Sequence, residues 1–125
     1  QKDYIQGLVE VQDYCRIHPE NSYLLDSWSF CYYRGGVFET RIYGPQNCVY
    51  SGGWFSNSPV LYQHMEQYLG RYDRDICLII YETEAAWESR PIIALLTEKF
   101  GSGPVLEDKL TVSNGGSYLI LRFGL

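Results

Sequence analysis

The stretch Asp75-Ile76-Cys77-Leu78-Ile79-Ile80-Tyr81-Glu82 decides the fold of this 125-residue chain. Only apolar residues stand between its two acidic ends, so no alternation of buried and exposed positions is seen. A short continuous apolar run is typical of a β-strand that is covered on both faces. The sequence therefore predicts a central strand over residues 76–81, with other elements packed against both of its sides.

One helix is predicted before this strand and another after it. Ser58-Pro59 begins the first helix and Gly70 ends it, because serine caps a helix, proline fits its first turn and glycine suits its carboxyl end. The second helix starts near Ser89, has Pro91 in its first turn and ends at Gly101. Helical spacing gives each one an apolar side: Leu61, Met65, Tyr68 and Leu69 in the first, and Ile92, Ile93, Leu95, Leu96 and Phe100 in the second.

Strands are predicted in the first third of the chain. Apolar and polar residues alternate from Tyr4 to Gln12, which indicates a strand. Residues 28–33 and 37–43 are rich in aromatic and β-branched side chains, and Arg34-Gly35-Gly36 joins them. We therefore expect these two segments to form a β-hairpin.

The last third of the chain predicts a second hairpin. Residues 110–112 and 117–123 flank Ser113-Asn114-Gly115-Gly116, which is a turn signal, and Val105-Leu106 predicts a short edge strand. The combined elements predict an α+β fold, with antiparallel β-sheets packed against two helices in one domain over residues 1–125.

Four cysteines, Cys15, Cys31, Cys48 and Cys77, are widely spaced and form no C-x-x-C pair, so a structural zinc site is not expected. An even cysteine number and a chain that starts at Gln1 predict a processed, secreted domain. All four cysteines are then expected to form two intramolecular disulfides. The alternative is a cytosolic domain with buried free thiols, because free cysteine packs as a small apolar side chain.

Charge and composition exclude several classes of function. The net charge of −5 disfavours nucleic acid as a partner, because phosphate recognition requires clustered lysine and arginine. No apolar run reaches the roughly 18 residues of a membrane span. Catalytic and phosphate-binding motifs are absent from the sequence, and the two histidines, His18 and His64, stand apart from each other. We expect no catalytic residues, cofactor or metal.

Loop aromatics are the strongest candidates for ligand binding. Trp54 and Phe55 follow Gly52-Gly53, and Tyr50 precedes them. Exposed aromatic rings at these positions would stack on a sugar or fill a pocket in a partner protein. The alternative is that Trp54 and Phe55 plug one end of the core.

Acidic residues surround an aromatic residue just after the predicted central strand. Glu82, Glu84 and Glu88 lie near Trp87 in the sequence. Three interpretations are open: a glycosidase-like carboxylate pair, a calcium or sugar contact, and an acidic helix start that favours the helix dipole. Glu82, Glu84 and Trp87 are therefore included among the candidate ligand-binding residues.

The order of elements from Val37 to Gly124 resembles the interleukin-like EMT inducer domain, also called the pancreatic-derived-factor-like domain. The resemblance rests on the strand 75–82, the acidic turn after it, the helix 92–100 followed by Gly101-Ser102, and the last aromatic strand. It implies a small secreted signalling protein, or a module of the kind found in the stem of a protein O-mannose N-acetylglucosaminyltransferase. Family members carry Arg-Asp before the aromatic residue of the last strand, a pair that helps the stem module hold a sugar. This chain has residues 113–117 there, before Tyr118.

These observations predict a secreted, non-enzymatic binding module that recognises a cell-surface protein or a glycan through its loop aromatics. A second hypothesis is an adhesive domain that assembles with itself through tyrosine-rich strand edges. A small hydrolase that uses Glu82, Glu84 or His64 is a third. The sequence does not determine the ligand or the oligomeric state.

Overall fold

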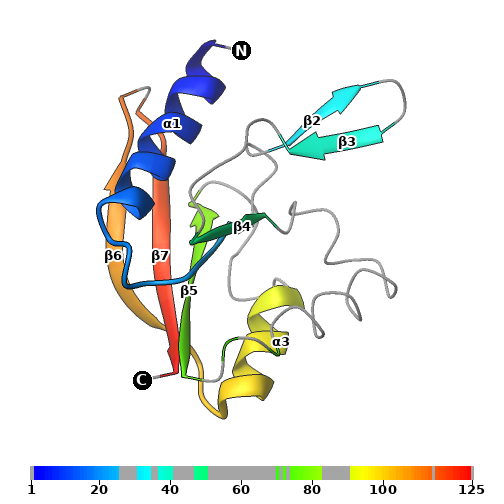
Figure 1. Ribbon diagram of the computed structural model, residues 1–125, viewed down its shortest axis with the longest axis vertical. Coiled ribbons are helices and arrows are strands. Elements are labelled where there is room, and N and C mark those ends of the chain that lie inside the picture. Colours follow the sequence, from blue (N-terminus) through cyan, green and yellow to red (C-terminus); the bar gives the residue numbers. More distant parts are fainter. Residues whose placement is uncertain are drawn as a thin grey trace.

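The computed structural model describes residues 2–25, 31–34, 37–40, 47–50, 70, 72, 74–82, 91–113 and 115–124 (Figure 1). Within them the chain forms two helices, a five-stranded sheet and a separate two-stranded hairpin. The α+β class predicted from the sequence is confirmed.

The five-stranded sheet is mixed, which corrects the expectation of purely antiparallel sheets. In spatial order its strands are β4 (Cys48–Tyr50), β1 (Tyr23–Leu25), β5 (Asp75–Tyr81), β7 (Ser117–Gly124) and β6 (Val105–Thr111). Strand β1 runs parallel to both β4 and β5, whereas β7 is antiparallel to β5 and β6. Strand β5 thus lies at the centre, as its apolar run predicted.

Both predicted hairpins are present. Strands β2 (Cys31–Arg34) and β3 (Val37–Thr40) pair antiparallel, with Arg34 opposite Val37. Strands β6 and β7 form the second hairpin, and β6 is an edge strand that is longer than the predicted Val105-Leu106 segment. A register shift between Leu106 and Asp108 interrupts their pairing.

The two faces of β5 pack into two separate hydrophobic clusters. Ile76, Leu78 and Ile80 join the cluster that contains the apolar residues of α3 (Pro91–Phe100). Cys77 and Ile79 join the cluster that contains Val11 and Cys15 of α1 (Lys2–Arg16). Successive strand residues point to opposite faces, so the two helices cover opposite sides of the sheet (Figure 1). The fold has three layers, helix, sheet and helix.

Helix α3 agrees with the sequence prediction. Pro91 is its first residue, and Gly101 follows its last. The amide of Gly101 donates to the carbonyl of Thr97 at 2.9 Å, and its φ of 77° is a left-handed conformation that suits glycine. The other predicted helix, over residues 58–69, lies outside the described residues.

The predicted strand over residues 4–12 is wrong, because this segment belongs to α1. Its alternating pattern also fits a helix, and the spacing of the buried residues decides between the two. Val11 and its neighbour Gln12 are both buried, as is Cys15, whereas Asp13 is exposed, and this spacing fits one face of a helix but not of a strand. The alternation continued for too few residues to exclude the helical period.

Polar contacts fix α1 against the β6–β7 hairpin. The carboxylate of Glu10 accepts hydrogen bonds from the amide and the hydroxyl of Ser113, at 3.0 and 2.8 Å. The hydroxyl of Tyr14 donates to Asp108 on β6 at 3.1 Å. Burial and this bond raise the pKa of Tyr14 above its usual range. Helix α1 is therefore held both by its apolar face and by its polar flank.

Candidate functional site

Three neighbouring strands of the sheet end at the same edge. Strands β4, β1 and β5 are parallel, so their carboxyl ends point the same way. The register places Tyr50, the last residue of β4, beside Leu25 of β1, and Leu25 beside Ile79 of β5. Binding residues in sheets with parallel strands are commonly found just beyond the carboxyl ends. We call this region the carboxyl edge and define it by Tyr50, Leu25, Tyr81 and Glu82.

Glu82 lies at the carboxyl edge, directly after β5. Its amide donates to the carbonyl of Ser117 at 2.9 Å, which fixes the backbone where the chain leaves the sheet. Its carboxylate pairs with Lys109 of β6 at 3.0 Å. Both side chains are about half exposed, so the pair contributes little to stability, roughly 0–1 kcal/mol. The two charged groups are accessible to a ligand.

Two tyrosines pack against each other at the carboxyl edge. The rings of Tyr81 and Tyr118, on neighbouring strands, have centroids 4.9 Å apart. Tyr118 is buried, and Tyr81 packs against the same cluster. A Cβ added at Gly116 would lie 2.8 Å from Cε1 of the Tyr81 ring, so this ring packs closely against Gly116. Both tyrosines of this pair therefore contribute to packing.

The predicted site residues are only partly described by the structure. Glu82 lies at the carboxyl edge, and Tyr50 ends β4, although its side chain is outside the description. Trp54, Phe55, Glu84 and Trp87 lie outside the described residues, as do Glu88 and His64. Lys109 was missed by sequence reasoning, because its pairing with Glu82 depends on the β6–β7 hairpin folding back onto β5.

The structure places three cysteines together instead of in disulfides. Cys15, Cys48 and Cys77 have free thiols, which differs from the expectation of two bridges and agrees with the alternative of buried thiols. Cys15 and Cys77 are completely buried, and Cys48 packs against their cluster while partly exposed. Cys31 belongs to β2, and its side chain is outside the description.

Electrostatics distinguish the three thiols. A hydrogen bond to Cys48, together with burial, raises the pKa of the Cys15 thiol. The same hydrogen bond, with help from the positive charge of Arg16, holds the pKa of Cys48 below its usual value. Burial raises the pKa of Cys77 to about 12. Cys48 is therefore the most acidic of the three.

Arg122 forms a charged network at the other end of β5, where it joins three strands. Its Nε donates a hydrogen bond to Glu107 Oε1 at 2.5 Å, and its Nη2 donates one to Glu107 Oε2 at 3.1 Å. Its Nη1 forms an ion pair with Asp75. Its Nη2 also reaches Asn21 Oδ1 at 3.2 Å. The bonds with Arg122 lower the pKa of Glu107. Because each of its side-chain nitrogens has a hydrogen-bond or ion-pair partner, Arg122 has a structural role in linking the strands.

The part of the chain that the structure describes offers neither a metal site nor a membrane-spanning helix. There, no three histidine, cysteine or acidic side chains gather closely enough to hold a metal ion. Likewise, none of the described helices is sufficiently long and apolar to cross a membrane.

Comparison with known proteins finds no relative of this chain. No family model, curated protein or solved structure matches this chain. The resemblance to the interleukin-like EMT inducer domain therefore stays a prediction.

Proposed function

We propose that this chain is a non-enzymatic binding module that holds an extracellular protein or glycan at the carboxyl edge. The observation that carries the proposal is the shared edge at which β4 and β5 end. Tyr50 and Glu82 are the last described residues before the two segments that contain the candidate aromatic residues. Two segments far apart in the sequence thus leave the sheet from one side.

Chain connectivity supports a common surface. Strand β1 alone separates β4 from β5, which corresponds to about 10 Å between the outer strands. An extended chain spans at most about 3.6 Å per residue. Trp54 is therefore within about 14 Å of Tyr50, and Glu84 within about 7 Å of Glu82. Aromatic rings and carboxylates within such reach suit a ligand that combines flat apolar faces with hydroxyl groups.

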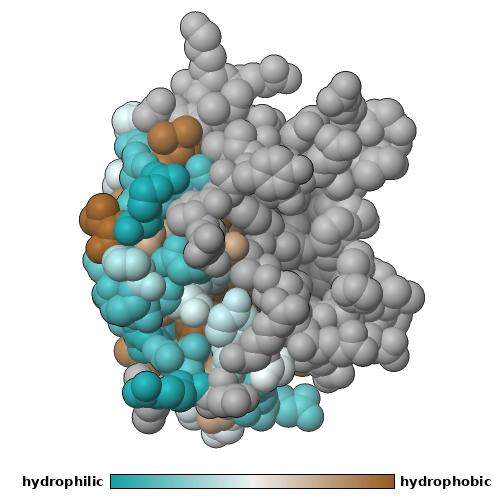
Figure 2. Space-filling model, in the orientation of Figure 1, coloured by the Kyte–Doolittle hydropathy of each residue, from teal (hydrophilic) through white to brown (hydrophobic). Residues whose placement is uncertain are grey.

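One of the two edge strands of the sheet, β6, is poorly suited to adhesive assembly. Strand β6 carries Glu107, Asp108 and Lys109 along the edge, and the register shift falls among them. Charged residues and irregular pairing are devices that keep an edge strand from adding another strand. The visible surface of this side is mainly hydrophilic, with small separate hydrophobic areas (Figure 2). Self-assembly through β6 is therefore disfavoured.

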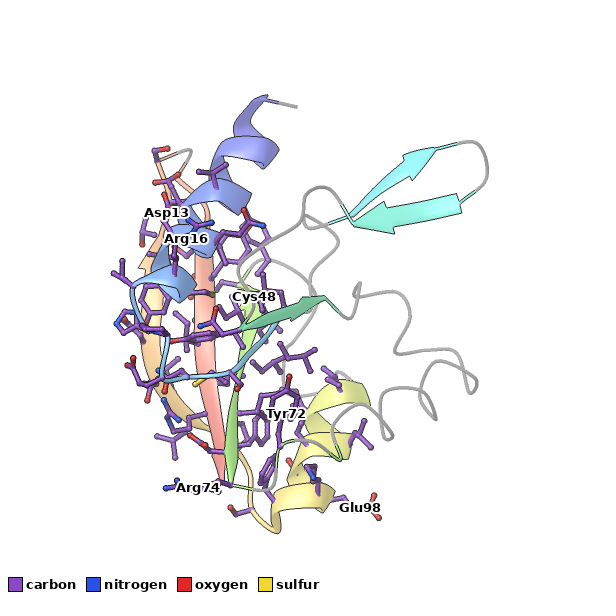
Figure 3. The ribbon with its side chains drawn as sticks, viewed as in Figure 1. Asp13, Arg16, Cys48, Tyr72, Arg74 and Glu98 are labelled. Atoms are coloured by element: carbon purple, nitrogen blue, oxygen red, sulfur yellow. The ribbon has the colours of Figure 1, made fainter. Side chains whose placement is uncertain are left out.

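The substitution Glu82→Gln is expected to weaken ligand binding about 10- to 100-fold, because a hydrogen bond to a charged acceptor contributes about 1.5–3 kcal/mol. Stability should change by less than about 1 kcal/mol, since the pair with Lys109 is half exposed. Binding of the labelled chain to cell surfaces, measured by flow cytometry, provides the readout. Glu98→Gln is the matched control, because exposed Glu98 lies near the far end of α3 (Figure 3).

The same assay separates the two ligand classes. Treating the cells with glycosidases should abolish binding of a glycan-specific module, whereas treatment with protease should abolish binding of a protein-specific one. Equal binding of the Glu82→Gln and Glu98→Gln variants would remove Glu82 from the proposed surface.

A further inference from the structure

Cys15 and Cys48 meet where the end of α1 approaches the edge strand β4. Cys15 lies in the hydrophobic cluster beneath α1, and Cys48 packs against the same cluster. The Cys48 thiol donates a hydrogen bond to Asn47 Oδ1 at 4.0 Å. The backbone is held at the same place, because the Asn47 amide donates to the carbonyls of Cys15 and His18 at 3.0 and 3.2 Å. In Figure 3, Cys48 lies beside the half of α1 that carries Asp13 and Arg16.

Cys77 is excluded from this pair by the register of the sheet. Cys48 and Cys77 both lie opposite Tyr23, one on each side of β1. Two strand spacings separate their Cα atoms by about 10 Å, whereas a disulfide requires Cα atoms within roughly 7 Å. Cys77 also donates its thiol hydrogen to Glu107 Oε2 at 3.6 Å and is completely buried. It is therefore an unreactive structural thiol.

We propose that Cys15 and Cys48 form a thiol–disulfide exchange site whose substrates are small-molecule disulfides. Cys48 is the attacking thiol, because it is partly exposed and lies on an edge strand. Cys15 is the resolving thiol, because it is completely buried in the cluster against which Cys48 packs. The lowered pKa of Cys48 and the raised pKa of Cys15 agree with this division of roles. This proposal is independent of ligand binding at the carboxyl edge.

The exchange proceeds in two steps that balance. The Cys48 thiolate attacks one sulfur of the small disulfide, forms a mixed disulfide and releases one thiolate. Cys15 then loses its proton to solvent and attacks the Cys48 sulfur, which breaks the mixed disulfide and releases the second thiolate. Two protein thiols are oxidised and one small disulfide is reduced to two thiols. Once Cys48 is no longer a thiolate, the interaction that most strongly disfavours ionisation of Cys15 is lost.

Peptide mapping tests the proposal directly, because trypsin places each cysteine on a different peptide: residues 3–16, 17–34, 42–71 and 75–99. The full chain is reduced, freed of reductant, exposed to oxidised glutathione, alkylated and digested. Mass spectrometry should find peptide 3–16 joined to peptide 42–71, while Cys77 remains alkylated. The number of free thiols in the denatured chain should fall from four to two.

Single variants distinguish the roles of the cysteines. Cys15→Ser should stop the reaction at glutathione on Cys48, and Cys48→Ser should abolish both the mixed disulfide and the bridge. Cys77→Ser is the control and should leave the bridge intact. If circular dichroism shows that Cys15→Ser does not fold, Cys15→Ala replaces it, and the order of modification in the unaltered chain is followed by rapid acid quenching.

Four results would overturn the proposal. One is the joining of peptide 17–34 to peptide 42–71, which would make Cys31 the partner of Cys48. The second is a bridge that survives Cys48→Ser, and the third is glutathione appearing first on Cys15 or Cys77. The fourth is four alkylated cysteines after prolonged exposure to the oxidant.

Discussion

Replacing Ile79 by alanine is expected to lower the free energy of unfolding by about 2–5 kcal/mol. Ile79 is completely buried on the face of β5 that packs beneath α1. The loss combines the transfer energy of the removed atoms with the cavity that they leave. Urea denaturation followed by circular dichroism measures it, and the slope of the transition should stay unchanged.

Glu98→Ala provides the comparison for this substitution, because Glu98 is exposed on α3 and should change stability by no more than about 0.5 kcal/mol. A loss below about 1 kcal/mol for Ile79→Ala would mean that β5 is not the central strand.

Gly124→Ala is the second change with a large expected effect, a loss of about 3–5 kcal/mol of unfolding free energy. Gly124 ends β7 opposite Asp75 and has a φ of 91°, a conformation that residues with a side chain rarely adopt. An added Cβ would also overlap the carbonyl oxygen of Arg74 and lie 2.8 Å from the Cα of Asp75. Both neighbours are backbone atoms, so neither can rotate away.

Gly115 offers a matched control for Gly124. It has the same φ of 91°, but an added Cβ there would meet nothing within 4 Å. Gly115→Ala therefore measures backbone strain alone, about 1–3 kcal/mol. Thermal and urea denaturation give the loss of unfolding free energy for each variant, and the two losses should differ by the cost of the overlap at Gly124. Equal losses would contradict the close pairing of Gly124 with residues 74–75.

The parts of the fold that were predicted correctly depend on local signals. The apolar run 76–81 marks β5, Pro91 and Gly101 bound α3, and the turn at 113–116 marks the last hairpin. The strand predicted over residues 4–12 was wrong because Val9 and Val11 fit the strand period as well as the helical one. The burial of Gln12 beside Val11, together with the exposure of Asp13, distinguishes the two.

The candidate site was harder to predict because its parts meet through long-range pairing. Nothing near Tyr50 in the sequence indicates that β4 runs parallel to β1 and ends at the same edge as β5. The pairing of Glu82 with Lys109 likewise depends on strand order. The packing of Cys15 and Cys48 in one cluster was missed for a related reason, since residue 15 was not placed on a helix above the sheet.

The central claim is that the segments leaving the carboxyl edge form a binding surface, and Trp54→Ala tests it most directly. Thermal melting of this variant is measured beside its binding to cell surfaces. The account predicts a loss of at least about 2 kcal/mol in binding, about 30-fold in affinity, with stability almost unchanged. A fall of about 3–5 kcal/mol in stability would instead identify Trp54 as part of the core and contradict the claim.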